Sequence, residues 1–362
     1  MGNYSPKLTN LAGQLMHIST PLNIVTGATG FLGAHVVCQL LQAGKTVRAF
    51  RRHTSDLKEF NLIFDWYLQN KLFEPNAREN LEWVEADVLD VDTLHEALQE
   101  ATVVYHCAAI VSFEPNMRDE MMKVNVEGTA NIVNISLLVG VKHFCYVSSI
   151  ASLGRRKKGE HIDENNRWEH SSLNSNYAIS KYRAELEVWR AAEEGLNVVM
   201  VNPGVFIGPG DFTKGSNHLI QSIYKGLPVY SMGINGYVDV RDVARAMLLL
   251  VERKITHKRF VMVSENMRIR DLFFAIADGF SKKRPAIMVK PWMAAIVWRL
   301  VWIIRLFGKK GIAITKETAR AAVNESFYSS QKIINELNFN FIPIAQTITD
   351  SCASYLKQNK TK

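Results

Sequence analysis

Three glycines between residues 26 and 33 constrain the fold of this chain more than any other feature. The apolar run 22–25 before them is typical of a short buried strand, and the helical pattern after them ends at Gly44. Gly27 permits a tight turn, Gly30 lets the backbone approach a pyrophosphate, and Gly33 lets the helix pack against the strand. A strand, a glycine turn and a helix in this order favour a dinucleotide site over a purely structural turn. The expected contacts are Gly27, Thr29, Gly30, Phe31, Leu32 and Gly33.

Strand-like runs alternate with helical patterns from residue 22 to about residue 200. After the first strand, the expected strands are 46–51, 81–85, 102–106, 143–148 and 197–201, with helices at 92–100 and 117–139. This alternation predicts an α/β fold built on a doubly wound parallel sheet. The runs 199–202 and 259–263 are expected to complete that sheet.

At 362 residues the chain has room for about two folding units. We expect residues 1–20 to form an N-terminal extension, since they contain no apolar run long enough for a signal peptide or a membrane span. Residues 21–204 and 237–263 are expected to form the dinucleotide-binding domain. Residues 205–236 and 264–362 are expected to form a smaller, discontinuous and mostly helical substrate domain.

Charge and cysteine content exclude some classes of function. The net charge is +8, but residues 279–311 hold eight Lys or Arg and no acid, and the other 35 basic residues equal the 35 acidic ones. The chain is therefore not a generally basic nucleic-acid binder. Its four cysteines lack metal-ligand spacing, so no metal site is expected, and their number suits a reducing cytoplasm.

The end of the second strand indicates which dinucleotide binds. Arg51 and Arg52 stand where the adenosine ribose is expected, and arginine favours the 2′-phosphate of NADP where an acid favours NAD. We therefore expect NADPH to be preferred, although Asp56 in the following loop leaves NAD open. Asp87, after the third strand, is placed to contact the adenine.

Tyr177 and Lys181 are four residues apart at the start of a helical pattern, so they share one helix face. A cation beside the phenol, together with the charge of an oxidised nicotinamide, is expected to lower the pKa of the phenol toward the range of a general acid. The fifth strand ends in Ser148 and Ser149, which brings a hydroxyl to the edge of the sheet where ligands bind. Together these residues indicate proton transfer to a substrate oxygen.

These motifs resemble those of an extended short-chain dehydrogenase/reductase, nearest the dihydroflavonol reductase, cinnamoyl-CoA reductase and 3β-hydroxysteroid dehydrogenase branch. The resemblance extends over roughly residues 21–358. It is carried by residues 26–33, 87, 106–109, 125–129, 148–149, 177–181, 202–204, 208–210 and 237–243.

The resemblance implies a Rossmann sheet and a role for each site residue. Tyr177 is the implied proton donor, Lys181 the implied ribose anchor that modifies the phenol, and Ser149, more than Ser148, the implied hydrogen-bond donor to the carbonyl. Further implied cofactor contacts are Val88, Ala108, Ala109, Asn125, Pro203 and Val205, in addition to Tyr177 and Lys181 themselves.

Two departures from the family pattern narrow the chemistry. Sugar-nucleotide dehydratases of the family carry an acid pair where this chain has Ile150 and Ala151, so water elimination is not expected. Asn202 stands where many relatives have arginine. We expect an NADP(H)-dependent oxidoreductase acting on a ketone, an aldehyde or the corresponding alcohol. A nucleotide-sugar epimerase and a non-catalytic NADP sensor or scaffold remain alternatives.

The substrate is expected to be a small, apolar carbonyl compound bound in a cleft above Tyr177. The candidate cleft residues are Val111, Ser112, Phe113, Met117, Phe206 and Tyr230, while His106 is expected to be a structural strand residue. The segment from Trp292 to Phe307 is too short and too charged to span a bilayer. It is expected either to pack on its own domain or to contact an anionic membrane surface peripherally. A homodimer is a further possibility.

Overall fold

The computed structural model describes residues 21–155, 159–290, 292–293 and 322–360. The expected N-terminal extension lies outside the described residues. So does nearly all of the segment from Trp292 to Phe307, of which only residues 292 and 293 are described. Among the described residues, no helix is both long and apolar enough to cross a membrane.

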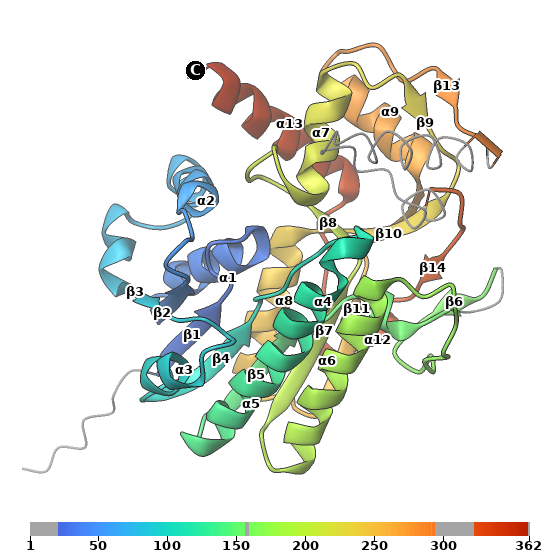
Figure 1. The fold of residues 1–362 in the computed structure, drawn as a ribbon. Coiled ribbons are helices and arrows are strands. Elements are labelled where there is room, and N and C mark those ends of the chain that lie inside the picture. Colours follow the sequence, from blue (N-terminus) through green and yellow to red (C-terminus); the bar gives the residue numbers. More distant parts are fainter. Residues whose placement is uncertain (1–20, 156–158, 291, 294–321, 361–362) are drawn as a thin grey trace, which may run out of the picture.

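A seven-stranded sheet with the strand order β11-β7-β5-β4-β1-β2-β3 forms the centre of the molecule (Figure 1). Every neighbouring pair in it is parallel. The strands are β1 (Leu22–Thr26), β2 (Thr46–Arg51), β3 (Leu81–Glu85), β4 (Ala101–His106), β5 (His143–Val147), β7 (Val198–Pro203) and β11 (Lys258–Met262). The strand order reverses between β1 and β4, and ligands bind at the carboxyl ends of the strands beside such a reversal. The predicted doubly wound sheet is confirmed.

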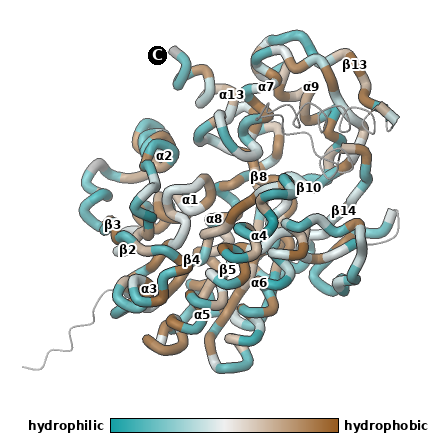
Figure 2. The backbone as a smooth tube through the Cα atoms, viewed as in Figure 1, coloured by the Kyte–Doolittle hydropathy of each residue, from teal (hydrophilic) through white to brown (hydrophobic). Residues whose placement is uncertain are grey.

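Helices cover both faces of this sheet. One face carries α1 (Phe31–Gln42), α2 (Lys58–Gln69), α8 (Val240–Glu252) and α12 (Gln331–Leu337), and the other carries α3 (Val91–Ala97), α5 (Gly128–Leu138) and α6 (Asn176–Glu193). Each strand contributes alternate residues to the two cores, because side chains alternate across a strand. In β1, for example, Val25 joins the first core and Ile24 the second. Figure 2 shows the middle strands mostly in the hydrophobic colour.

The sequence patterns missed or simplified two helical regions. Helix α2 was not anticipated, although Phe60, Ile63, Phe64 and Tyr67 bury one of its faces. The helix expected at 117–139 is interrupted: α4 (Arg118–Met122) continues into a π-helical turn at Lys123–Glu127 before α5. The extra residue in a π turn rotates the helix face, and such turns are frequent at functional sites.

A second group of elements lies beyond the carboxyl ends of the main sheet. The strands β8 (Val205–Ile207), β10 (Ile234–Asp239) and β12 (Glu265–Arg268) form a small sheet, and α7 (His218–Tyr224), α9 (Ile269–Gly279) and α13 (Ile344–Lys360) enclose a separate apolar core. Two short pairs, β9 (Val229–Tyr230) with β13 (Ile287–Met288) and β6 (His161–Ile162) with β14 (Phe327–Tyr328), complete it. The division into a cofactor domain and a substrate domain remains a proposal. Helix α12, which lies within the part of the chain expected to form the substrate domain, packs beside β11 of the main sheet.

Candidate active site

A cavity of about 1510 Å³ opens at the carboxyl ends of the main-sheet strands. It brings together nearly all of the site residues predicted from the sequence. Those that line it are Gly27, Thr29, Gly30, Phe31, Leu32, Gly33, Arg51, Arg52, Asp87, Val88, Ala108, Ala109, Ser149, Tyr177, Lys181 and Val205. Asn125 and Pro203 are not among its lining residues.

The glycine turn is shaped by contacts with backbone atoms. Gly27 has a φ of +65°, and a Cβ there would lie 2.7 Å from the backbone nitrogen of Ala108. A Cβ on Gly33 would lie 2.2 Å from the carbonyl oxygen of Gly27. On Gly30, by contrast, a Cβ would meet only one described atom, at 3.4 Å, so the protein itself leaves room at this position. This agrees with Gly27 and Gly33 shaping the turn and Gly30 facing a ligand.

The N-terminus of α1 has the properties of an anion site. Its N-cap is Gly30, which makes no side-chain capping bond, and its first turn contains no acid. The first amide groups of a helix lack partners within the helix, and the helix dipole places partial positive charge there. The turn therefore fits a pyrophosphate.

At the adenosine end, Arg51 and Arg52 are exposed side chains beside the cavity. The amide of Arg52 donates to the hydroxyl of Ser55, which also lines the cavity. Asp56 instead accepts the amide of Lys58 at the start of α2 and is not a lining residue. The arrangement brings two guanidinium groups and a hydroxyl together at this end of the cavity, where they could bind an anionic ligand.

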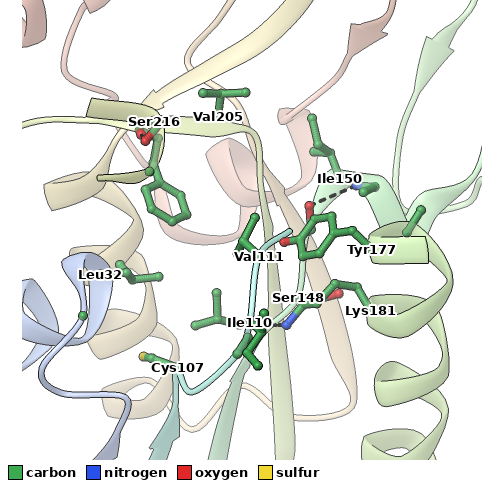
Figure 3. A pocket seen from close by; sticks show the side chains of 18 of the residues that line it. Leu32, Cys107, Ile110, Val111, Ser148, Ile150, Tyr177, Lys181, Val205 and Ser216 are labelled. Carbon is green, nitrogen blue, oxygen red and sulfur yellow. Dashed lines mark hydrogen bonds between the residues drawn. The ribbon is translucent and has the colours of Figure 1, made fainter. Parts of the chain in front are cut away.

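Lys181 is held tightly at the floor of the cavity. Its ammonium donates to the carbonyl of Val147 at 2.6 Å and lies 4.5 Å from the centre of the Tyr146 ring. Burial lowers the pKa of Lys181 to about 7, and the carboxylate of Glu185 partly opposes this shift. Figure 3 shows Tyr177 and Lys181 extending from the same helix into the site.

Two effects shift the pKa of the Tyr177 phenol in opposite directions. Burial raises this pKa, and the nearby hydroxyl of Ser149 only partly opposes that shift. Within the protein alone burial dominates this pKa, so the lowering expected from Lys181 together with an oxidised nicotinamide stays a prediction. A phenol with a raised pKa carries its proton at neutral pH and can donate it.

The two serines after β5 have different surroundings. Ser149 is the N-cap of a short 3-10 helix (Ile150–Leu153), where its hydroxyl accepts the amide of Ala151 at 3.1 Å. Ser148 donates to Ser152 at 3.1 Å, inside the protein. The contact with Tyr177 favours Ser149 as the serine that meets a substrate oxygen.

Asn125 has a positioning role that sequence reasoning missed. Its amide side chain in the π-helical turn is bonded to both backbone groups of Ile110, at 2.7 and 2.9 Å, and to the hydroxyl of Ser180 at 3.0 Å. It therefore ties the loop after β4 to the helix that carries Tyr177. No single residue type signals this role, since it depends on the turn of the helix.

His106 is structural, as expected from the sequence. It is fully buried between the hydroxyls of Thr26 and Thr129, at 2.7 and 3.0 Å from its two ring nitrogens. Burial lowers the pKa of His106 to about 3. The ring is thus neutral and links β1 and β4 to α5.

Away from the glycine turn, the cavity lining combines apolar side chains with polar ones such as Glu160, Asn235 and Asn324. Val111 and Phe113 are 62% and 40% exposed, although both are large apolar residues, and the Phe113 ring lies 5.9 Å from that of Tyr177. Of the predicted cleft residues, Val111, Phe113 and Phe206 line the cavity, whereas Ser112, Met117 and Tyr230 do not. Sequence reasoning missed Ile150, Ile162, Ile234, Asn235 and residues 323–326 and 328. Among the described residues, no cluster of His, Cys, Asp and Glu could hold a metal ion.

Known proteins share both this sequence and this fold. A cinnamoyl-CoA reductase 1 of Oryza sativa subsp. japonica is 31% identical over 268 residues, which cover 71% of this chain and 75% of the relative. A Synechocystis protein, provisionally named a dihydroflavonol 4-reductase, is 29% identical over 90% of this chain and 92% of its own. The solved structure of the protein gox2253 is 31% identical, with a TM-score of 0.76 over 94% of this chain and 99% of its own.

A model of the NAD dependent epimerase/dehydratase family matches residues 23–263. These residues contain the glycine turn, Ser149, Tyr177 and Lys181. Since the match covers well over half of the chain, the protein belongs to the NAD-dependent epimerase/dehydratase family, the extended short-chain dehydrogenases/reductases.

Proposed function

We propose that this protein is an NADP(H)-dependent reductase of a ketone or aldehyde, able to run in reverse on the secondary alcohol. The observation that carries the proposal is the convergence of Ser149, Tyr177 and Lys181 in one cavity with an uncapped glycine turn. Relatives named as reductases support the same class of reaction.

Each of the three site residues has a separate role in the proposed carbonyl reduction. A nicotinamide bound in the cavity would supply the hydride. Tyr177, which holds its proton at neutral pH, gives that proton to the substrate oxygen, and Ser149 donates a hydrogen bond to the same oxygen. Lys181 binds the nicotinamide ribose and adds positive charge near the phenolate that forms.

The preference for NADPH is proposed from Arg51 and Arg52. Both side chains are exposed at the adenosine end of the cavity, on the strand end where NAD-selective sites carry an acid. Guanidinium groups bind phosphate through several charge-assisted hydrogen bonds. The 2′-phosphate of NADP would add such bonds, whereas NAD has only a hydroxyl there.

The substrate is proposed to be apolar. Apolar and aromatic side chains in the cavity lining support this, namely Val111, Phe113, Ile150, Ile162, Phe206 and Tyr328, and two of them, Val111 and Phe113, are large exposed hydrophobic residues. Exposed apolar surface in a concave site is typical of ligand binding.

A turnover assay with Tyr177→Phe tests the proposed function. NADPH oxidation would be followed with a panel of apolar ketones and aldehydes. We expect kcat to fall roughly 100- to 10,000-fold with little change in NADPH affinity, because the phenol acts on the substrate. Tyr182→Phe is the matched control, since Tyr182 stacks on Trp168 at 4.4 Å on the outer side of the same helix. A Tyr177→Phe enzyme that kept more than about a tenth of the rate, a barrier change under roughly 1.4 kcal/mol, would refute the acid role.

We also propose peripheral contact with an anionic membrane surface, through which an apolar substrate could be collected. The contact would involve the segment from Trp292 to Phe307 and the residues just before it. Three exposed apolar residues of this region are described, and the exposed fractions are 49% for Ile287, 39% for Met288 and 61% for Trp292. Lys282, Lys283 and Lys290 lie in the same stretch of chain. Apolar side chains with basic neighbours suit an anionic headgroup region. Flotation with phosphatidylserine vesicles should show salt-sensitive binding that Trp292→Ser weakens, and no binding at low ionic strength would refute the contact.

A further inference from the structure

A buried carboxylate, Glu185, lies one helical turn after Lys181 on α6. Its side chain is only 2% exposed, yet it does not line the cavity. An ionised carboxylate in such a place requires charged or hydrogen-bonding partners. The partners of Glu185 connect it to the reaction centre in two directions.

The first partner is Arg259, in β11. One guanidinium nitrogen lies 3.0 Å from Oε2 of Glu185, and the others donate to the carbonyls of Glu164 and Asn166. Arg259 is thereby fixed by three groups and forms a buried ion pair with the Glu185 carboxylate. Asn202, where many relatives have arginine, leaves this compensation to the neighbouring strand.

The second set of partners leads to Ser149. Oε1 of Glu185 lies 2.6 Å from the hydroxyl of Ser152 and 2.5 Å from the side-chain nitrogen of Asn202. Both of those groups also reach the carbonyl oxygen of Ser149, at 2.7 and 3.2 Å. The hydroxyl of Ser152 has one proton and can donate it either to Glu185 or to the carbonyl of Ser149. The side-chain amide of Asn202 lies within reach of both acceptors and can donate to the other one. The backbone of Ser149 is thus held through two side chains that converge on Glu185.

The other direction leads to Lys181. The titratable groups that face its ammonium are Tyr177 and Glu185 from α6, Tyr146 from β5, and His106 and Cys107 from the end of β4. His106 and the tyrosines are neutral near pH 7, since burial lowers the pKa of the histidine and raises those of both phenols. Burial likewise raises the pKa of Cys107 to about 12. Among the described groups that face Lys181, Glu185 is therefore the carboxylate that offers a counter-charge, and its effect is to raise the pKa of Lys181.

We propose that Glu185 is a positioning residue of the reaction centre, which holds the Ser149 turn through Ser152 and Asn202 and balances the charge of the Lys181 ammonium. That the Ser149 turn and the Lys181 ammonium matter for catalysis rests on the proposed function. The placement of Glu185 itself does not, because it follows from the contacts of the protein alone.

The pH dependence of Lys181 acetylation tests the proposal without substrate or turnover. The full-length protein would be treated with trace acetic anhydride over a pH series, and labelling of Lys181 would be read by peptide mass spectrometry. Only the neutral amine reacts, so the rate rises as the pH passes through the pKa of Lys181, about 7 in the native protein. Glu185→Gln removes a negative charge that favours the ammonium, and the midpoint should fall by about one pH unit or more.

Two further variants separate positioning from a loss of stability. Ser152→Ala cuts the link to Ser149 but removes no charge, so its midpoint should stay at the native value. Glu185→Gln with Arg259→Met removes both charges together and spares the fold an unpaired buried guanidinium, so it serves if the single variant does not fold. It should also lower the midpoint, because Arg259 is not among the groups that face Lys181.

An unchanged midpoint in the folded Glu185 variant, single or double, would overturn the proposal, whatever the loss in melting temperature. An equal shift in Ser152→Ala would overturn it as well, since the effect would then follow packing and not charge. Failure of the reductase assay would leave this result standing, because labelling requires neither cofactor nor substrate.

Discussion

The two halves of the cavity are built in different ways. The cofactor half consists of strand ends and the α1 N-terminus, and its shape depends on backbone atoms, such as the carbonyl of Gly27 beneath Gly33. The substrate half is assembled from side chains on the loop after β4, on β8 and β10, and on residues 323–328. Backbone geometry is nearly independent of side-chain identity, whereas an apolar wall changes with every substitution. The half shaped by the backbone is therefore the part that identifies the family. The half lined by side chains is the part that we propose selects the substrate.

Among changes that test this contrast, the largest effect on ligand binding is expected from Gly33→Ala in the cofactor half. Its Cβ would lie 2.2 Å from the Gly27 carbonyl oxygen, so the helix or the turn must move. We expect a loss of about 1–3 kcal/mol in the free energy of unfolding and a fall in NADPH affinity on the order of 100-fold. Denaturant unfolding and fluorescence titration would measure the two.

Gly44→Ala is the control for Gly33→Ala. Gly44 has a φ of +67°, but a Cβ there would meet no described atom within 4 Å, so the change costs only backbone strain, about 1–2 kcal/mol. NADPH affinity should not change. If Gly33→Ala bound NADPH as the native protein does, the cofactor half would not depend on backbone contacts as described.

An intermediate effect is expected from Arg51→Asp, which changes a side chain in the cofactor half. The acid repels the 2′-phosphate and can accept from a ribose hydroxyl, so the preference for NADPH over NADH should fall by at least about tenfold. Titration with both cofactors would measure it. Arg253→Asp, on an exposed residue outside the cavity lining, makes the same charge change and should leave the preference intact. An unchanged ratio in Arg51→Asp would assign the preference to other residues.

The smallest effect is expected from Phe113→Ala in the substrate half. Phe113 is 40% exposed and contacts Tyr177 edge to face, so its loss should barely change the free energy of unfolding. KM for an apolar substrate should rise roughly two- to tenfold, because the substrate would lose a contact with the Phe113 ring worth about 0.5–1.5 kcal/mol. NADPH affinity should stay constant. Leu138→Ala, 70% exposed on α5, is the control for loss of surface apolar area. A drop in NADPH affinity in Phe113→Ala would mean that the two halves are not separable.

The same contrast explains what could be predicted from the sequence. The strands of the main sheet were placed to within a residue or two, because each is a short apolar run ended by a turn, and the glycine turn follows from local spacing. Asn125 was expected to contact the cofactor, but the structure uses its side chain to hold Ile110 and Ser180. The orientation of this side chain follows from the π-helical turn, which no local pattern in the sequence predicted.

Long-range contacts were the least predictable part of the site. The pairing of Glu185 with Arg259 joins a helix to a strand 74 residues later in the chain, and nothing near either residue indicates the other. The wall formed by residues 323–328 reaches the cavity because β14 pairs with β6 and Ile234 bridges to Glu325. Such contacts depend on the assembled fold, so the identity of the substrate is the property that the sequence determines least directly.

In the proposed reaction, bound NADPH would give hydride to a carbonyl carbon in the cavity and Tyr177 would protonate the oxygen. Reaction with NADPH deuterated at C4 of the nicotinamide, followed by mass spectrometry of the alcohol, tests it most directly. We expect one deuterium on the carbinol carbon with the native protein and with Tyr182→Phe, and almost no product with Tyr177→Phe. Alcohol without deuterium from either face of the nicotinamide, or undiminished labelled product from Tyr177→Phe, would contradict it.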